Sequence, residues 1–398
     1  MHALADLNFR YCTPIQAETL SKTLNGKDAF GQAQTGTGKT AAFLITILHH
    51  FHQHKINGSR PKATPRALII APTRELAIQI GRDAEQLAKY EQCNIVTVFG
   101  GVDYRKQRRQ LQGTPIDIIV ATPGRLLDFQ RSKEINLRRV EVLVIDEADR
   151  MLDMGFIPDV RRIVRNLPDK SKRQTMLFSA TLTNDVKYLG MNWTTDPHIV
   201  EIEPEHVAVD TVDQKVFIMS TDQKFTLLYN MITQEKMERV IIFCNRRDQA
   251  RDLADLLWRY ELDCELLSGD VHQKKRMKVL DRFKSGEINI LVATDVAGRG
   301  IHVEGLDHVV NYNLPQDAED YVHRIGRTGR AGQSGTSISF ACEIDSHNIP
   351  AIEELLGKEL VCEYPDESLL TELPAPKRDA KSQRPSSPLG KKKYRGRR

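Results

Sequence analysis

The sequence predicts an α/β protein with two repeated domains, each a mainly parallel sheet with helices on both faces, followed by a disordered basic C-terminal tail. Three observations support this prediction. The 398 residues exceed the length of one ordinary domain. Short apolar runs alternate with helical segments, as is typical of parallel sheets covered on both faces. The end of the chain is rich in Lys, Arg, Pro and Ser and has few apolar residues, so it cannot bury a core.

The apolar runs fall into two series, and each run has the length and composition of a buried strand. Strands of the first series are expected at residues 67–71, 95–98, 116–120, 142–146 and 175–178. Those of the second series are expected at residues 216–218, 240–243, 264–267, 290–293, 308–311 and 337–340. Helices are expected from Pro14 to about Leu24 and from Thr40 to about His50.

The domain boundaries follow from a break between the two series. Residues 204–212 contain a proline among acidic residues and show no periodicity, which is typical of a linker. The sequence therefore predicts an N-terminal domain at residues 1–203, a C-terminal domain at residues 213–365 and a tail at residues 366–398. The tail has ten Lys or Arg and four Asp or Glu. The excess positive charge of the whole chain therefore lies in the tail.

The composition excludes several classes of protein. No apolar run approaches the ~18 residues of a transmembrane helix, and no basic segment followed by an apolar core marks a secretory signal. The six cysteines are scattered without a C-x-x-C pair, so neither a zinc site nor a disulfide framework is expected. These features predict a protein of a reducing cytoplasm with no membrane association.

Residues 33–40, which read Ala-Gln-Thr-Gly-Thr-Gly-Lys-Thr, are typical of a phosphate-binding loop that closes into a helix. Gly36 and Gly38 allow backbone N–H groups to face a triphosphate, and the following helix offers its positive N-terminus to the same anion. Lys39 supplies charge to the β and γ oxygens, and the Thr40 hydroxyl can bind Mg²⁺. Ala33 stands where the general pattern has its first glycine.

A predicted strand that ends in acidic residues supplies a second half of this site. Four apolar residues at 142–145 precede Asp146 and Glu147, at the strand end where open α/β sheets bind ligands. A carboxylate at Asp146 can hold Mg²⁺ through water, and Glu147 can orient or deprotonate an attacking water. The two motifs together predict a site that hydrolyses a nucleoside triphosphate.

The second series has no phosphate-binding loop and carries instead residues 321–330, Tyr-Val-His-Arg-Ile-Gly-Arg-Thr-Gly-Arg. Three arginines and a histidine beside glycines are not typical of a core. We expect them to face a triphosphate across a cleft, where an arginine that neutralises transition-state charge is worth roughly 10³–10⁵ in rate. A solvated basic helix end is the alternative.

Taken together, these motifs resemble those of the DEAD-box RNA helicases of superfamily 2, whose signature is spelled by residues 146–149. The match is an ordered set that spans residues 9 to 340. It comprises residues 13–16, 33–40, 71–77, 100–101, 122–125, 146–149 and 179–181, then residues 242–245, 273 with 276, 293–300 and 323–330. The resemblance implies two tandem RecA-like domains that close over ATP and single-stranded RNA.

The resemblance also implies roles at the ATP site. Gln16 would recognise adenine and Phe9 would stack on the base. Asp146 would hold the water shell of Mg²⁺, Glu147 would activate the hydrolytic water, and Lys39 would bind the phosphates. Arg327 and Arg330 would be arginine fingers from the second domain. The implied ATP-binding residues are Phe9, Gln16, Gln34, Thr35, Gly36, Thr37, Gly38, Lys39 and Thr40.

Two further groups of residues are implied by the resemblance. Asp149, Ser179, Thr181 and His323 would couple the ATP site to strand separation. The RNA backbone would be lined by Pro72, Thr73, Arg74, Gly101, Thr122, Arg125, Asn245, Gln273, Thr294 and Gly298. Contacts to phosphate and sugar position RNA without reading its bases, so little sequence specificity is expected. We expect the basic tail to contact RNA as well, with a solubilising role as the alternative.

Some positions depart from the family pattern. Gln16 lies too close to Met1 for the second aromatic residue that usually precedes it. His302 stands where most members have an aspartate that contacts the ATP ribose, and we assign it no role. A histidine there is typical of the RhlB-type bacterial branch, as are residues 267–271 and 337–343. That branch implies a role in mRNA decay with an endoribonuclease scaffold of an RNA degradosome.

We therefore expect a monomeric, RNA-dependent ATPase that unwinds short duplexes, with ATP and Mg²⁺ as cofactors and single-stranded and short duplex RNA as partners. Three alternatives remain open at this point. The same residues would serve an ATP-gated RNA clamp or assembly subunit with little unwinding of its own. A P-loop kinase or GTPase would not explain the second domain or residues 323–330. DNA as the substrate is less expected on family grounds.

Overall fold

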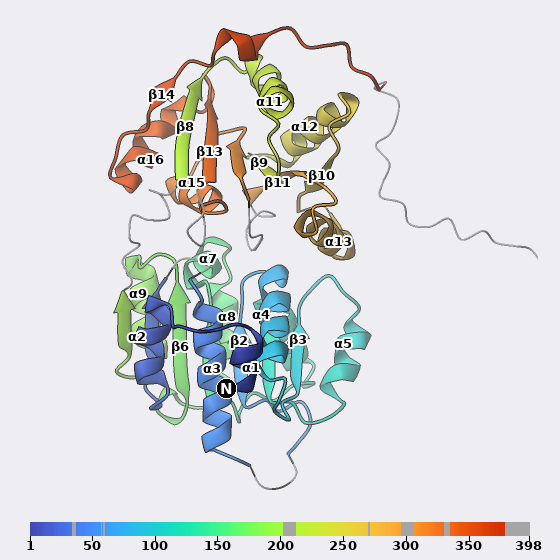
Figure 1. Cartoon of the computed structure of the whole chain (residues 1–398). Coiled ribbons are helices and arrows are strands. Elements are labelled where there is room, and N and C mark those ends of the chain that lie inside the picture. The colour runs from blue at the N-terminus through green and yellow to red at the C-terminus, as the bar shows by residue number, and fades with distance from the viewer. Residues whose placement is uncertain are drawn as a thin grey trace, which may run out of the picture. The chain divides into compact units, whose positions relative to one another are not determined.

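The structure is a computed structural model, and it describes residues 1–33, 37–56, 58, 60–201, 212–269, 271–295, 306–329 and 335–378. The chain divides into two compact units, Met1–His206 and Val207–Arg398. Each unit contains one seven-stranded sheet (Figure 1). The division falls within residues 204–212, the predicted linker, most of which lies outside the described residues.

The first unit contains a sheet in the order β3-β4-β2-β5-β6-β1-β7. All neighbouring strands pair in parallel, so their carboxyl ends lie along one edge of the sheet. The predicted strands of this unit are confirmed, and β1 and β7 are additional. The strands are β1 (Ala29–Gln32), β2 (Ala67–Ile70), β3 (Ile95–Val98), β4 (Ile118–Ala121), β5 (Val142–Ile145), β6 (Gln174–Ser179) and β7 (His198–Glu201).

Helices cover both faces of this sheet, because parallel strands are joined by crossovers. Successive strand residues point to opposite faces. Ile69 and Val144 belong to the apolar cluster shared with α3 and α4, whereas Leu68 and Ile145 belong to the cluster shared with α6 to α9. The helices are α1 (His2–Asp6), α2 (Pro14–Thr23), α3 (Lys39–Gln53), α4 (Arg74–Leu87), α5 (Tyr104–Leu111), α6 (Pro123–Arg131), α7 (Ala148–Asp153), α8 (Ile157–Val164) and α9 (Asn184–Trp193).

The second unit repeats this topology, with the sheet order β10-β11-β9-β12-β13-β8-β14. β8 takes the place of β1, β9 that of β2, and the later strands follow in step. The predicted strands of the second series are confirmed, and β14 is additional. The strands are β8 (Val212–Ile218), β9 (Val240–Cys244), β10 (Cys264–Leu267), β11 (Ile290–Thr294), β12 (His308–Asn311), β13 (Gly335–Ala341) and β14 (Cys362–Glu363). The fold class predicted from the sequence is therefore confirmed for both units.

The helices of the second unit also pack on both faces of their sheet. They are α11 (Gln223–Gln234), α12 (Arg247–Arg259), α13 (Gln273–Lys284), α15 (Ala318–Ile325) and α16 (Ile349–Leu356). Ile242 and Val292 join the cluster beside α11 and α12, whereas Ile241 and Leu291 join the cluster beside α13. In the described parts of both units, no helix has the length and apolar character that crossing a membrane requires.

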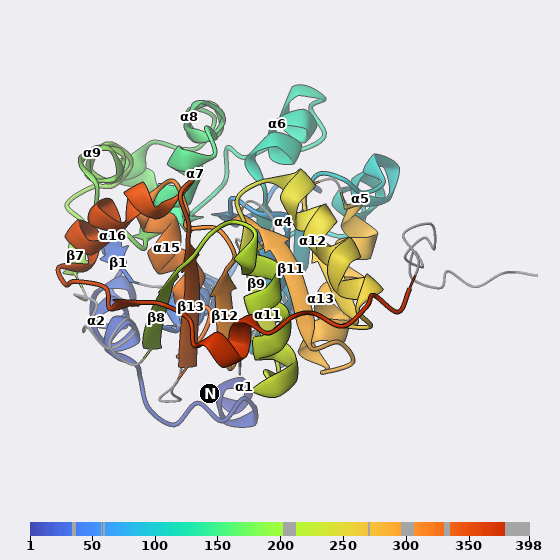
Figure 2. The ribbon, with the colours of Figure 1, turned by 90° about the horizontal axis from the view of Figure 1, so that it is seen from above.

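The structure describes residues 366–378 as packed chain, which differs from the prediction of a disordered tail beginning at residue 366. Glu367–Leu370 forms a short 3₁₀ helix, and Leu369, Leu370 and Leu373 pack on the cluster beside α11. The guanidinium of Arg378 lies 4.8 Å from the ring centroid of Trp258 and donates to its carbonyl at 3.1 Å. Figure 2 shows this red segment passing α11. Residues 379–398 lie outside the described residues.

Candidate functional site

The phosphate-binding loop of the first unit connects β1 to α3, which begins at Lys39 at the carboxyl edge of the sheet. Gln34, Thr35 and Gly36 lie outside the described residues. Gly38 precedes the helix with a φ of 91°, a left-handed conformation that favours glycine. A Cβ on Gly38 would lie 2.3 Å from Nε2 of Gln16. Both the backbone conformation and the packing therefore require glycine here.

Lys39 and Asp146 form a buried ion pair at the ends of α3 and β5. The Nζ of Lys39 lies 3.7 Å from Oδ1 of Asp146, and the two side chains are 5% and 3% exposed. The same Nζ donates a hydrogen bond of 2.9 Å to the carbonyl of Ala33. Burial raises the pKa of Asp146 to about 6, although the nearby charge of Lys39 opposes that rise. The fold thus brings together the two halves of the predicted triphosphate site.

Gln16 ties the start of α2 to the phosphate-binding loop. Its Nε2 donates to the Gly38 carbonyl at 3.2 Å, and its Oε1 accepts from the Thr13 N–H at 3.0 Å. The Thr13 hydroxyl donates to the carbonyl of Thr37 at 2.8 Å. Among the described contacts, the amide keeps one N–H and one acceptor direction, which is the pair that an adenine edge requires. Phe9, the predicted stacking residue, is 42% exposed.

Glu147 follows Asp146 in an uncommon backbone conformation. Its φ is 52°, in the left-handed region, and its N–H donates to Oδ1 of Asp146 at 3.0 Å. One carboxylate oxygen, Oε2, is buried without a hydrogen bond from the described residues and lies 3.7 Å from Nε of Arg150. A buried acceptor without a partner costs roughly 1–3 kcal/mol. A bound water or ligand would complete it.

Asp149 joins the start of α7 to the end of β6. Its Oδ2 accepts hydrogen bonds from the N–H groups of Ala180 and Thr181 at 2.9 and 3.0 Å, and the Thr181 hydroxyl lies 3.4 Å away. The N–H of Asp149 donates to Oγ of Ser179 at 3.1 Å. Three of the predicted coupling residues therefore form one hydrogen-bonded cluster beside Asp146 and Glu147.

The oxygen donors near Lys39 suit Mg²⁺ bound together with a nucleoside triphosphate. In the part of the chain that the structure describes, no group of three or more His, Cys, Asp or Glu side chains could hold a metal ion. Mg²⁺ typically takes one or two protein oxygens and completes its octahedron with water and substrate phosphates. The buried carboxylate of Asp146 and the hydroxyl of Thr40, in the first turn of α3, fit that pattern.

Two of the RNA-contact motifs predicted in the first unit meet at the same edge of the sheet. Pro72 and Thr73 lead into α4, where the Thr73 hydroxyl caps the helix by accepting from the Leu76 N–H at 3.3 Å. The guanidinium of Arg74 packs on the backbone of Gly101, whose φ is 79°. A Cβ on Gly101 would lie only 2.1 Å from Nη1 of Arg74. Gly101 is thus the residue that allows these two motifs to touch.

The third motif of the first unit, at Thr122 and Arg125, is held by α5. Thr122 immediately precedes α6. Arg125 donates to Oε1 of Gln107 at 2.8 Å and to the Val102 carbonyl at 3.3 Å. Its guanidinium lies 5.5 Å from the ring centroid of Tyr104. Arg125 is therefore fixed in place before any RNA binds.

In the second unit, the predicted RNA-contact residues again follow the carboxyl ends of strands. Asn245 follows β9, and Thr294 ends the neighbouring strand β11. Gln273 is the first residue of α13 and is buried. Gly298 and His302 lie outside the described residues.

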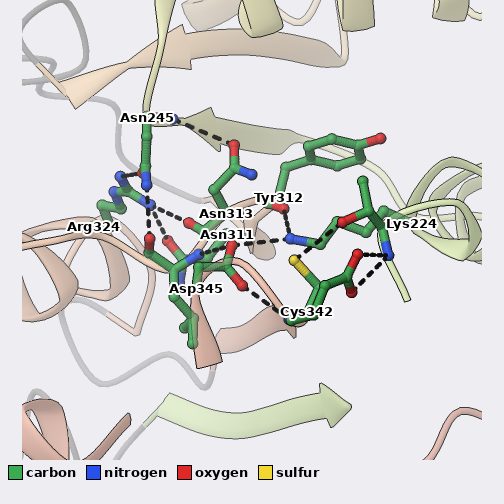
Figure 3. Close-up of polar contacts among 11 residues, drawn as sticks. Lys224, Asn245, Asn311, Tyr312, Asn313, Arg324, Cys342 and Asp345 are labelled. Carbon is green, nitrogen blue, oxygen red and sulfur yellow. Dashed lines mark hydrogen bonds and ion pairs between the residues drawn. The ribbon is translucent and has the colours of Figure 1, made fainter. Parts of the chain in front are cut away.

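Arg324 and Arg327 are both buried, which corrects the expectation that the arginines of residues 321–330 are not part of a core. Arg324 makes the larger number of described contacts. Its side chain is 2% exposed. Nε and Nη2 donate to the two carboxylate oxygens of Asp295 at 2.5 and 2.7 Å, and Nη2 also donates to Oδ1 of Asn245 at 2.7 Å. Nη1 donates to Oδ1 of Asn311 at 3.2 Å and to the Asn313 carbonyl at 2.7 Å. Every N–H of the guanidinium is paired (Figure 3).

Arg324 and Asp295 were not predicted from the sequence as residues that position the site. The signal available was an arginine one turn after Tyr321 and directly before Ile325, both of which are buried apolar residues of α15. Neither residue needs to touch a ligand to matter, because Arg324 holds the side chain of Asn245 directly. The network thus links α15 to the strand ends that carry predicted RNA contacts.

A second buried ion pair lies beside this network (Figure 3). Lys224 donates to Oδ2 of Asp345 at 3.0 Å and to the Tyr312 carbonyl at 3.1 Å. Asp345 also accepts from the N–H groups of Leu314 and Cys342 at 3.2 and 2.8 Å. Among the described residues, this pair contacts none of the predicted site residues and instead joins α11 to the segments that follow β12 and β13.

The remaining predicted residues of the second unit lie at the end of α15. His323 has its Nδ1 3.9 Å from Oδ1 of Asp320. Arg327 donates from Nε to the carbonyl of His323 at 3.1 Å, one turn back along the chain. Arg330 lies outside the described residues.

Comparison with known proteins identifies the family. Residues 13–189 match the model of the DEAD/DEAH box helicase family, and residues 223–332 match that of the helicase conserved C-terminal domain. The chain is 57% identical over 374 residues to the ATP-dependent RNA helicase RhlB of Pseudomonas putida, covering 94% of each protein. It is 47% identical over 379 residues to the RhlB of Pectobacterium atrosepticum, covering 95% of this chain and 88% of that protein.

Solved structures agree with this similarity. S. cerevisiae Dbp5 bound to RNA and ADP BeF3 matches with a TM-score of 0.80 and 30% identity over 91% of this chain and 92% of that one. Mss116p bound to ssRNA and AMP-PNP matches with a TM-score of 0.80 and 30% identity over 92% of this chain and 77% of that one. The chain therefore belongs to the DEAD-box family of superfamily 2 ATP-dependent RNA helicases, and within that family it is RhlB-like.

Proposed function

We propose that this helicase unwinds short RNA duplexes locally, by closing its two units over ATP and single-stranded RNA. The observation that carries the proposal is the arrangement at the end of β5. Lys39 lies 3.7 Å from Asp146, and the adjacent Glu147 has a buried carboxylate oxygen that lacks a hydrogen bond within the described residues. A phosphate-binding cation, a Mg²⁺-binding carboxylate and a base for water are thus adjacent, which is the set that triphosphate hydrolysis requires.

In this proposal the first unit binds ATP and Mg²⁺. Gln16 and Phe9 hold the adenine, residues 34–40 hold the phosphates, and Thr40 with Asp146 holds Mg²⁺. When held by these residues, Mg²⁺ would neutralise charge on the phosphates. Glu147 orients the hydrolytic water and accepts its proton. Lys39, released from part of its pairing with Asp146, donates to the phosphates.

The second unit supplies the remaining parts of the proposed ATPase. Arg327 and Arg330 act as arginine fingers, and His323 is the coupling residue of the second unit. Asp149, with its hydrogen bonds to Ser179 and Thr181, couples conformational changes at the ATP site to the RNA-contact loops. Because closure requires both ligands, each ligand should tighten the other by the same factor.

RNA binding is proposed along the loops at the carboxyl edges of both sheets. The contacts are those of Pro72, Thr73, Arg74, Gly101, Thr122 and Arg125 in the first unit, and Asn245, Gln273, Thr294 and Gly298 in the second. Most of these groups can reach phosphate and sugar rather than base edges, so unwinding should depend weakly on sequence. The basic residues of 379–398 would add contacts that weaken with salt.

The cellular setting is proposed from the similarity to RhlB-type helicases. We infer a role in mRNA decay, in which the chain acts beside an endoribonuclease scaffold of an RNA degradosome. A cytoplasmic location fits its six cysteines, all of which are free thiols. A monomer suffices, because one chain carries both halves of the proposed ATP site.

Strand displacement tests the proposal against the RNA-clamp alternative. A labelled strand is annealed to RNA with a single-stranded extension, and its ATP-dependent release is followed for a series of duplex lengths. Local unwinding predicts fast release of short duplexes that falls steeply with duplex length, because every added base pair must be broken before the labelled strand is released. Release that is absent at every length, together with long ATP-dependent residence on RNA, would contradict unwinding and favour a clamp.

A further inference from the structure

We propose that the outward face of α5 is an additional RNA-binding surface, which holds the phosphate backbone beside the contacts of Gly101 and Arg125. The proposal rests on the proposed function, because it extends the RNA path of the first unit. No part of the family's motif set described above falls within α5 itself. The surface is defined by Arg105, Lys106 and Arg109.

All the charged side chains of α5 are basic, and the carboxylate of its N-cap residue, Asp103, accepts from the backbone N–H of Arg105 at 2.8 Å. The helix reads Tyr-Arg-Lys-Gln-Arg-Arg-Gln-Leu and contains no acidic residue. Its four basic side chains are exposed. Arg108 pairs with Glu134 at 2.8 Å, whereas no carboxylate in the described residues forms an ion pair with Arg105, Lys106 or Arg109. Three cations are therefore available for an anion from outside the chain.

This charge arrangement is unfavourable for the helix alone. Arg105 and Arg109 are an i,i+4 pair and Lys106 and Arg109 an i,i+3 pair, and like charges at these spacings destabilise a helix by roughly 0.2–0.5 kcal/mol each. Cations in the first turn also oppose the helix dipole. A helix whose charged side chains serve only solubility can carry both acidic and basic residues, as α12 does with three arginines and three aspartates. The uniform sign of α5 instead suits a polyanion.

The inward face of α5 fixes these cations next to the predicted RNA contacts. Gln107 donates from Nε2 to the carbonyl of Phe99, at the end of β3, at 3.2 Å, and accepts from Arg125 at 2.8 Å. The ring of Tyr104 stacks on Phe129 of α6, with centroids 4.5 Å apart. α5 is therefore joined both to the turn at Gly101 and to α6. RNA that reaches Arg125 would pass directly beside the α5 cations.

The chemistry of this surface indicates the part of RNA that it binds. Arginine and lysine side chains on an exposed helix present charge without a pocket for a base, so they contact phosphate oxygens. Such contacts release counterions, so affinity falls as salt rises. For a single strand, each phosphate contact adds about 0.7 to the slope of log affinity against log salt concentration. The three cations therefore predict a contribution of about 2 to that slope.

The test compares two variants of the full chain with the same change of charge. The first carries Arg105→Gln, Lys106→Gln and Arg109→Gln on α5. The control carries Lys133→Gln, Arg138→Gln and Arg139→Gln, three exposed cations that lie before β5 and so at the opposite edge of the same sheet. Binding of a labelled oligouridylate is measured with AMP-PNP over a salt series.

For the α5 variant, the slope of log affinity against log salt concentration is expected to be shallower by about 2. Its affinity near 0.1 M salt is expected to be roughly 10- to 100-fold weaker. The control is expected to keep the wild-type slope. An α5 variant with the wild-type slope and affinity would overturn the proposal. Failure of the wild type itself to bind the RNA would instead contradict the proposed function, so the two failures are distinguishable.

Two further measurements separate RNA contact from a structural role of α5. The melting temperature of the α5 variant should equal or exceed that of the wild type, because repulsion within the helix is removed. A second variant, Arg105→Lys with Arg109→Lys, keeps the charge and should keep the salt slope. Loss of binding in this charge-conserving variant would overturn the assignment to phosphate contact.

Discussion

Replacing Arg324 by methionine should destabilise the second unit severely. The guanidinium is 2% exposed and uses every N–H, and its removal leaves the Asp295 carboxylate, 18% exposed, without its counter-charge. Breaking a buried ion pair by deleting one partner typically costs 3–5 kcal/mol. We expect Arg324→Met to lower the free energy of unfolding of the second unit by about 3–5 kcal/mol.

The two tryptophans of the chain make this measurement possible in the intact protein. Trp193 belongs to the first unit and Trp258 to α12 of the second. In a Trp193→Phe background, urea unfolding followed by Trp258 fluorescence reports on the second unit. Adding Asp295→Asn to Arg324→Met should restore part of the stability, because no unpaired charge is then buried.

A matched variant separates the stability effect from the effect on RNA binding. Lys224→Met breaks the other buried pair of this unit and should cost a similar free energy. Only Arg324→Met should also raise the RNA concentration that half-saturates the ATPase, because Arg324 holds Oδ1 of Asn245. A loss below about 1 kcal/mol for Arg324→Met would show that the buried pair contributes little to stability. An equal RNA effect for Lys224→Met would show that Arg324 does not act through Asn245.

Two further predictions concern the first unit. Burial alone would raise the pKa of Glu141, but hydrogen bonds from His50 and Arg66 hold it at about 2, below its ordinary value of 4.5. The carboxylate therefore stabilises the fold above pH 4.5, and Glu141→Gln should cost at most about 3 kcal/mol at pH 7 in urea unfolding. That cost should vanish as the pH falls toward 2, and a cost that persists there would contradict the assignment. Gly101→Ala should weaken RNA binding, since its Cβ would displace the arginine packed on it. Gly26→Ala is its control, because its φ is also positive but open space surrounds it, and equal RNA affinities for both variants would contradict the packing argument.

Much of the fold could be predicted because parallel strands covered on both faces are continuous apolar runs. The strand at 142–145 is fully buried on both faces and was visible from its composition alone. β1 was not predicted, because its sequence, Ala-Phe-Gly-Gln, lacks the continuous apolar run of the other strands. Its glycine is required by packing, since a Cβ on Gly31 would lie 2.9 Å from the ring of Phe178. That contact joins distant parts of the sequence and has no local signal.

The residue types of the candidate site could be predicted from sequence motifs, whereas the hydrogen bonds between those residues could not. The sequence indicated Lys39, Asp146 and Glu147, because phosphate and metal chemistry restricts residue types. It did not indicate that Gln16 bonds to the Gly38 carbonyl, or that Asp149 accepts from Ala180 and Thr181. These hydrogen bonds use backbone groups, which every residue has. The pairing partner is therefore decided by the fold rather than by the residue type.

The packed segment at residues 366–378 was missed for a different reason. The composition of 366–398 as a whole is polar and basic, and averaging over that range hid a short leucine-rich stretch. Leu369, Leu370 and Leu373 are enough to hold the segment on α11, with Arg378 against Trp258. Considered apart from the basic residues that follow, these three leucines indicate a segment that can pack on a core.

In the proposed mechanism, closure around ATP and RNA brings a water activated by Glu147 to the γ-phosphate. Steady-state ATPase activity of the wild type and of Glu147→Gln, each with and without single-stranded RNA, tests it most directly. We expect RNA to stimulate the wild type strongly, and the variant to lose about 10²–10⁴-fold in rate. Glu147→Gln should still bind ATP and RNA. Turnover that is independent of RNA would contradict the proposed coupling of closure to hydrolysis, and a variant that keeps its RNA-stimulated rate would contradict the role of Glu147.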